Sequence, residues 1–147
     1  MTVVKKLPVG VVGEIADSSI ARVLTKTTGT GGVEIGKALT ETAGVVANGG
    51  TGGANFVGIA VSPKQYAKDG LGSTMQVKAN SFVEALSFGR VWVKVSAAVT
   101  VGAQATFDAS GNISSATGAG NVAIANSKFL TAATGGTGDD VALLQLS

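Results

Sequence analysis

The stretch that decides the fold is "FGRVWVKV", residues 88–95, in which two kinds of side chain alternate. Side chains of a β-strand point to opposite faces in turn, so this alternation predicts a strand with two different faces. The first face carries small apolar residues: Gly89, Val91, Val93 and Val95. The second carries two aromatic residues and two cations: Phe88, Arg90, Trp92 and Lys94. We expect the valine face in a core, which leaves the chain's only tryptophan on the outside.

Similar short, valine-rich runs recur along the chain, separated by glycine clusters and other turn residues. The runs are 9–16, 20–25, 56–61, 74–79, 82–87, 90–95, 104–108, 122–125, 128–133 and 140–146. This pattern predicts an all-β fold: an antiparallel sandwich, jelly roll or barrel, of which we favour a small sandwich or jelly-roll-like domain. The segment 37–43 is compatible with a short strand or one helical turn. At most one short helix is expected, over 62–69, where Ser62 can cap and Pro63 occupies the first helical position.

Turn and loop segments are marked by their composition. Residues 108–112, "DASGN", predict a turn, because Gly and Asn tolerate positive φ and Asp can bond the backbone two residues on. The segments 27–36, 44–54 and 134–140 are rich in glycine and are predicted to be surface loops or hairpin tips.

The chain length of 147 residues fits one β domain, predicted over 9–147, preceded by an extended arm over 1–8. The arm contains Val3, Val4, Lys5 and Lys6, and Pro8 separates it from the next run. Such an arm can add a strand to the open edge of a neighbouring subunit. The alternative is a frayed chain end.

Composition argues against several classes of function. Only 14% of residues are charged and the formal net charge is +2, with no cluster of cations and aromatics of the kind that binds nucleic acid. No apolar run approaches the length of a membrane span, and the run after Lys5 and Lys6 ends too early for a signal peptide. We therefore expect a soluble protein that is made in a cytoplasm and binds neither nucleic acid nor membrane.

Catalytic and metal-binding motifs are weak. The segment 31–38, "GGVEIGKA", departs from the phosphate-loop pattern because Ala38 replaces the hydroxyl residue that holds magnesium. Asp139 and Asp140 offer only two adjacent carboxylates, fewer than a calcium site needs. The chain has no His and no Cys, so bases and nucleophiles would have to come from scattered carboxylates, amines or Tyr66. We expect no catalytic residues, no metal and no cofactor.

The outward face of residues 88–94 allows two interpretations. Trp92 and its neighbours can pack against side chains of adjacent strands. Alternatively they contact a partner protein, since Trp and Arg are enriched at the energetically important positions of interfaces. The low charge of the chain favours contact, because little electrostatic repulsion keeps subunits apart.

Several stretches together carry a resemblance to a known family. They are "VGEIADSSIARV", "VGIAVSPKQY", "ALSFGRVWVKV" leading into "VGAQATFDASGNI", and the closing "DDVALLQLS". Their order and character, from about Val12 to the end, resemble the structural cement, or head decoration, proteins of tailed bacteriophages. The most specific part is the G-R-V-W-V-K-V strand followed by the hairpin that contains Phe107, Asp108 and Gly111.

The resemblance implies a virion structural protein on the outer surface of the capsid, made in the bacterial host cytoplasm, that clamps neighbouring major capsid subunits and performs no chemistry. Its expected partners are the major capsid protein and copies of itself, as a homodimer or, as the second choice, a homotrimer. The expected contact residues are the four of the arm and the four of the outward strand face named above. The alternatives are a carbohydrate-binding or adhesin-like β-sandwich using Trp92 and Tyr66, and a small enzyme.

Overall fold

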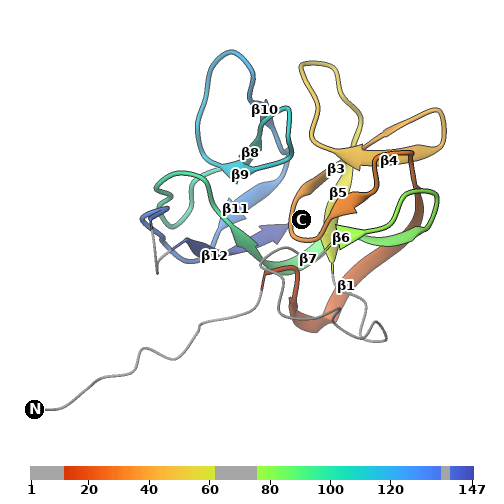
Figure 1. The fold of residues 1–147 in the computed structure, drawn as a ribbon. Coiled ribbons are helices and arrows are strands. Elements are labelled where there is room, and N and C mark those ends of the chain that lie inside the picture. The colour runs from red at the N-terminus through yellow and green to blue at the C-terminus, as the bar shows by residue number, and fades with distance from the viewer. Residues whose placement is uncertain (1–11, 62–75, 137–139) are drawn as a thin grey trace, which may run out of the picture.

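The computed structural model describes residues 12–61, 76–136 and 140–147, without the side chains of residues 17–20 (Figure 1). Within these ranges the regular structure consists of β-strands, which confirms the all-β prediction. The predicted helix at 62–69 and the predicted arm at 1–8 lie outside the described residues. None of the described segments is a helix that is long and apolar enough to cross a membrane.

The strands form one large sheet and two small ones. The large sheet runs in the order β1-β4-β3-β5-β7-β12-β11. Its strands are β1 (Ile15–Thr28), β3 (Ala38–Thr42), β4 (Val45–Asn48), β5 (Phe56–Val61), β7 (Phe82–Lys94), β11 (Ser127–Phe129) and β12 (Val141–Leu146). The small sheets pair β2 (Val33–Glu34) with β6 (Gln76–Val77), and β8 (Thr106–Phe107) with β9 (Ile113–Ser114) and β10 (Val122–Ala123).

The large sheet closes on itself, because β1 pairs both with β4 and with β7. The β1–β4 contact is parallel and short, with Thr27 opposite Val45 and Thr28 opposite Val46, whereas the other pairs of the sheet are antiparallel. A first hydrophobic core is formed by seven buried residues: Val33, Ile35, Leu39, Val46, Ala60, Val83 and Ala85.

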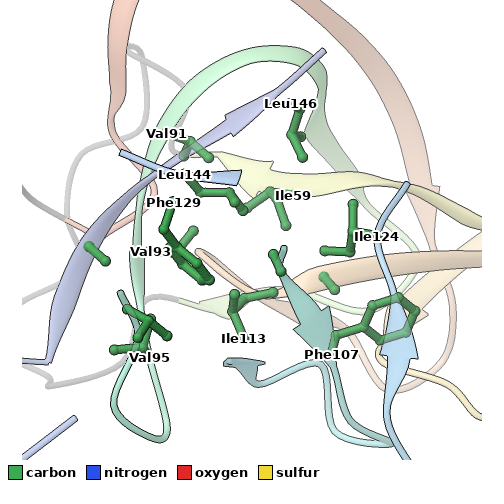
Figure 2. Packing of buried hydrophobic residues seen from close by; sticks show 14 of the residues in the cluster. Ile59, Val91, Val93, Val95, Phe107, Ile113, Ile124, Phe129, Leu144 and Leu146 are labelled. Atoms are coloured by element: carbon green, nitrogen blue, oxygen red, sulfur yellow. The ribbon is translucent and has the colours of Figure 1, made fainter. Parts of the chain in front are cut away.

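A second, larger core uses the opposite faces of β3, β5 and β7. It lies between these faces, the strands β11 and β12, and the small sheet of β8, β9 and β10. In Figure 2, Ile59 of β5, Leu144 of β12 and Ile113 of β9 gather in this core. Adjacent residues of one strand therefore serve different cores: Ile59 belongs to the second and Ala60 to the first. A strand buried on both faces reads as a continuous apolar run, which explains "FVGIAV" at 56–61.

The alternation of inward and outward side chains along strand β7 shifts by one residue in the middle of the strand. Val83 and Ala85 face the first core, whereas Val91 and Val93 face the second. The consecutive residues Arg22 and Val23 of β1 pair with Phe88 and Leu86, so Ser87 is an extra residue, a β-bulge. A bulge re-aims the side chains that follow it, and the runs 82–87 and 90–95 consequently form one strand.

Several boundaries predicted from the sequence differ in the structure. In the described part of the predicted run 9–16, only residues 15–16 belong to β1, which also contains the run 20–25 and bulges around Asp17–Arg22. The predicted loops 27–36 and 44–54 contain the strands β2 and β4, because Val33 and Val46 supply side chains to the first core. The segment 37–43 forms the strand β3 rather than a helical turn.

The predicted turn at 108–112 is confirmed, and it joins the small sheet of β8, β9 and β10 to the strand β3 of the large sheet. Asp108 Oδ1 accepts hydrogen bonds from the backbone N–H groups of Ser110, at 2.9 Å, and Asn112, at 3.0 Å. Burial raises the pKa of the Asp108 carboxyl, but hydrogen bonds from the side chain and backbone of Asn112 and from Ser110, together with the nearby Lys37, outweigh it and lower this pKa from 3.8. The turn docks on β3, whose Ala38 N–H donates to the carbonyl oxygen of Gly111 at 3.0 Å.

Two loops without charged residues project from the fold. Figure 1 shows the β4–β5 loop and the β9–β10 loop extending in the same direction past the strands. These loops, residues 49–55 and 115–121, contain no charged residue.

Candidate partner-contact face

The second half of β7 displays its two faces as the sequence predicts. Val91 and Val93 are fully buried and Val95 is 1% exposed. On the opposite side Phe88 is 38% exposed, Arg90 and Lys94 are exposed, and Trp92 is half-buried. The structure therefore brings these four predicted contact residues together on one outward side of a strand whose other side is held in the core.

Strand β12 continues this surface. It pairs Leu143 with Trp92, Gln145 with Arg90 and Val141 with Lys94. Residues directly opposite each other on paired strands point to the same side of a sheet. The seven residues form what we call the outer face: Phe88, Arg90, Trp92, Lys94, Val141, Leu143 and Gln145. The tryptophan thus stands beside a half-buried leucine, an arrangement that supplies an apolar centre.

Polar groups surround this apolar centre. Arg90 Nε donates a hydrogen bond to Gln145 Oε1 at 3.3 Å. On β11, the exposed Lys128 pairs with Gln145, so a polar row crosses three strands. Lys94 Nζ lies 3.6 Å from Asp140 Oδ2, with 69% of the lysine side chain exposed. An exposed ion pair of this kind contributes about 0–1 kcal/mol to stability, so it is not needed to hold the strands together.

The β12 and β11 residues of this surface were not identified from the sequence. Their signal is the alternation in "VALLQL", residues 141–146, where Ala142, Leu144 and Leu146 are buried and the residues between them are half-buried. This alternation reveals a face but not its neighbour, because strand register depends on the folded chain.

The four arm residues predicted as contacts, Val3, Val4, Lys5 and Lys6, lie outside the described residues. The described chain begins beside the outer face. The backbone N–H of Gly13 donates to the carbonyl oxygen of Trp92 at 2.8 Å, and that of Trp92 donates to Glu14 at 3.0 Å. Residues 13–14 thus run alongside the part of β7 that carries the tryptophan.

The weaker motifs form no catalytic arrangement in the described part of the chain. Residues 31–38 contain β2 and lead into the strand β3, whereas a phosphate-binding loop leads into a helix. Asp140 pairs with Lys94, and its neighbour Asp139 lies outside the described residues. In the ranges 12–61, 76–136 and 140–147, no three His, Cys, Asp or Glu side chains are grouped so that they could hold a metal ion.

Comparison with known proteins identifies relatives of this fold and sequence. The model of the family described as structural cement protein (E217 gp24/Pam3 gp6) matches residues 1–147. No curated protein matches the chain. Among solved structures, a chain of "The capsid of Myoviridae Phage XM1" is similar with a TM-score of 0.70 and 18% sequence identity, covering 92% of this chain and 88% of that chain.

At that identity the structural likeness shows a shared fold, while the family match spans the whole sequence. The all-β fold and the family match agree with the resemblance found in the sequence. The chain belongs to the structural cement protein family of bacteriophages and is a structural component of the virion.

Proposed function

We propose that this protein sits on the outer surface of the capsid, bridges neighbouring major capsid subunits and catalyses no reaction. The observation that carries the proposal is the outer face, where Trp92 and Arg90 stand on a strand whose opposite side is completely buried. The family match supports a role as a cement protein. The outer face supports partner contact, because tryptophan and arginine are enriched at protein interfaces.

A rigid support makes this face suitable for binding. Val91 and Val93 fix the second half of β7 in the core, and β1 and β12 flank it on its two edges. Binding through such a strand orders little backbone, so less of the contact energy is lost to conformational entropy. Trp92 adds a large contact area, and the polar row of Arg90 and Gln145 adds orientation.

Bridging requires more than one attachment per cement unit. A homodimer, which we favour over a homotrimer, carries two outer faces and converts two modest contacts into one strong attachment. Closed two-fold symmetry is also the commonest arrangement of soluble homo-oligomers. Residues 3–6 of the arm would add a further contact with a neighbour, which deletion of residues 2–7 tests directly. Shell occupancy should fall without the arm, and unchanged occupancy would remove this part of the proposal.

The contact face is tested with purified protein and empty capsids. Combined Arg90→Ala and Trp92→Ala should weaken binding by about 30-fold or more, because the loss of a single interface hot spot already costs about 2 kcal/mol or more. Lys78→Ala is the matched control, since Lys78 is exposed on a different segment. Co-sedimentation measures binding, and circular dichroism checks the fold. Equal occupancy by the double variant and the control would refute the contact role.

Bridging itself is tested by heating capsids with and without the bound protein. A bridge must break before the capsid subunits separate, so decorated shells should open at a higher temperature. Identical opening temperatures at full occupancy would show that the protein decorates the shell without cementing it.

A further inference from the structure

Exposed apolar side chains concentrate along strand β1. The exposed large hydrophobic residues of the described chain are Val23, Leu24, Val45, Phe82, Phe88 and Val101. All except Val101 belong to β1 or to residues paired with it, because Thr27 pairs with Val45 and Phe82, and Arg22 pairs with Phe88. A concentration of this kind on one strand indicates a surface that a partner covers.

Strand β1 also has an edge that is open with respect to the described residues. One edge pairs with β7 as far as Thr27, whereas the other meets β4 only at Thr27 and Thr28. Between Arg22 and Lys26 no described residue pairs with that second edge, and β1 runs along the outside of the fold in Figure 1. Unpaired backbone groups at a sheet edge are a template for another strand.

The strand at the other end of the sheet is protected by contrast. On the side of β11 that faces away from β12, the N–H of Phe129 donates to Ala103 at 3.0 Å, and the carbonyl of Phe129 accepts from Gly102 at 2.8 Å. The open edge of β1 is therefore a property of this strand and not of every strand that ends the sheet.

The shape of the exposed surface favours a strand as its partner. Val23 and Leu24 are consecutive, so they point to opposite faces of the sheet, yet they are 37% and 40% exposed. A flat protein surface can cover only one of these faces. A strand that pairs with the edge brings its own side chains over both faces and satisfies the backbone groups as well.

We infer that β1 is the edge through which two copies of this chain pair, antiparallel and about a two-fold axis. The inference rests on the proposed homodimer and assigns its interface. β1 itself offers what the partner strand must have, namely an open edge with apolar side chains on both faces. An interface of this isologous kind sets the same strand of each copy against the other.

The charges of β1 are compatible with self-pairing. Lys26 and the exposed Arg22 lie at the two ends of the segment 22–26, and two facing copies would bring these like charges together. The ammonium group of Lys26 is bound to Glu41 of its own chain, with Nζ and Oε2 2.6 Å apart. This ion pair reduces the repulsion across the axis, and the neighbours Thr25 and Thr27 are neutral. The outer face lies on β7 and β12, and it stays available in the dimer apart from Phe88, which is paired with Arg22 of β1.

The oligomeric state of the whole purified chain tests this assignment without capsids. Sedimentation over a range of concentrations should show a dimer for the natural sequence. Val23→Glu combined with Leu24→Glu should raise the dimer Kd by about 100-fold or more, because each copy loses two apolar contacts and adds like charges. Val101→Glu is the control, since Val101 is 66% exposed and lies away from β1. An unchanged Kd in the double variant, or a natural chain that stays monomeric, would overturn the inference.

Two further measurements keep the test decisive. If the glutamate variant does not fold, Val23→Thr with Leu24→Thr keeps the β preference while removing the apolar groups, and it should weaken the dimer in the same direction. Amide exchange at residues 22–26 should slow as the concentration rises and the edge becomes paired. Exchange that does not depend on concentration would place the dimer interface elsewhere.

The outcomes separate this inference from the proposed function. A monomeric β1 variant together with normal decoration by the Arg90 and Trp92 double variant would support the interface and refute the contact face. A β1 variant that stays dimeric, with loss of decoration by the Arg90 and Trp92 variant, would refute the interface and support the contact face.

Discussion

Replacement of Gly111 by alanine tests the contact between the turn at 108–112 and strand β3. Gly111 has a φ of 83°, and a Cβ atom added there would lie 2.9 Å from the carbonyl oxygen of Ala38 and 2.9 Å from the backbone nitrogen of Gly49. Both neighbours are backbone atoms and cannot rotate away as a side chain would. The variant must therefore open the hydrogen bond between Ala38 and Gly111 or displace the turn.

The expected cost has two parts. A non-glycine residue with a left-handed backbone costs roughly 1–2 kcal/mol, and overpacking against fixed atoms costs typically 1–3 kcal/mol more. Gly44→Ala isolates the first part, because Gly44 has nearly the same φ, 82°, and nothing lies within 4 Å of its added Cβ. We expect Gly111→Ala to be less stable than Gly44→Ala by about 1–3 kcal/mol.

Urea unfolding followed by circular dichroism measures both variants. For a domain of this size 1 kcal/mol corresponds to roughly 2–4 °C in Tm, so in thermal unfolding the melting temperatures should differ by about 2–12 °C. Equal stabilities of the two variants would refute the reasoning, because they would show that the turn does not press against the backbone of Ala38 and Gly49.

Three other substitutions test the cores and the turn. Phe129→Ala should cost about 3–5 kcal/mol of unfolding free energy, because Phe129 is fully buried; a loss near zero would contradict its place in the second core. Thr28→Val should cost about 1–3 kcal/mol, since it leaves the Lys78 carbonyl and the Ser81 N–H, now 2.7 and 2.9 Å from Thr28 Oγ1, without partners; a neutral effect in urea unfolding would argue against these bonds. The folded state lowers the pKa of Asp108, so its stabilisation is present above pH 3.8 and disappears as the pH falls through the lowered value. Asp108→Asn should therefore lose less stability than the natural chain between about pH 5 and pH 2, and parallel acid curves would contradict the assignment.

Local features were accessible from the sequence because they depend on neighbouring residues. The alternation around Trp92 predicted the buried valines, and the residue types of 108–112 predicted the turn. Both depend on geometry within a few residues, namely the period of a strand and the positive φ of a glycine.

Features that depend on distant parts of the chain were not accessible. The Ser87 bulge joins two runs that alternate in different phases, and it becomes visible only when β7 is aligned with β1. Val45 and Val46 appeared to belong to a glycine-rich loop, yet Val46 is buried because β1 and β3 lie on either side of it. The neighbours of Trp92 and the open edge of β1 are likewise consequences of register.

The most direct test of the central claim is a cryo-electron microscopy map of capsids decorated with this protein. The account predicts that the outer face of β7 and β12, with Trp92 at its centre, lies against the major capsid protein. A map in which this face points to solvent, while another surface of the subunit holds it on the shell, would contradict the account.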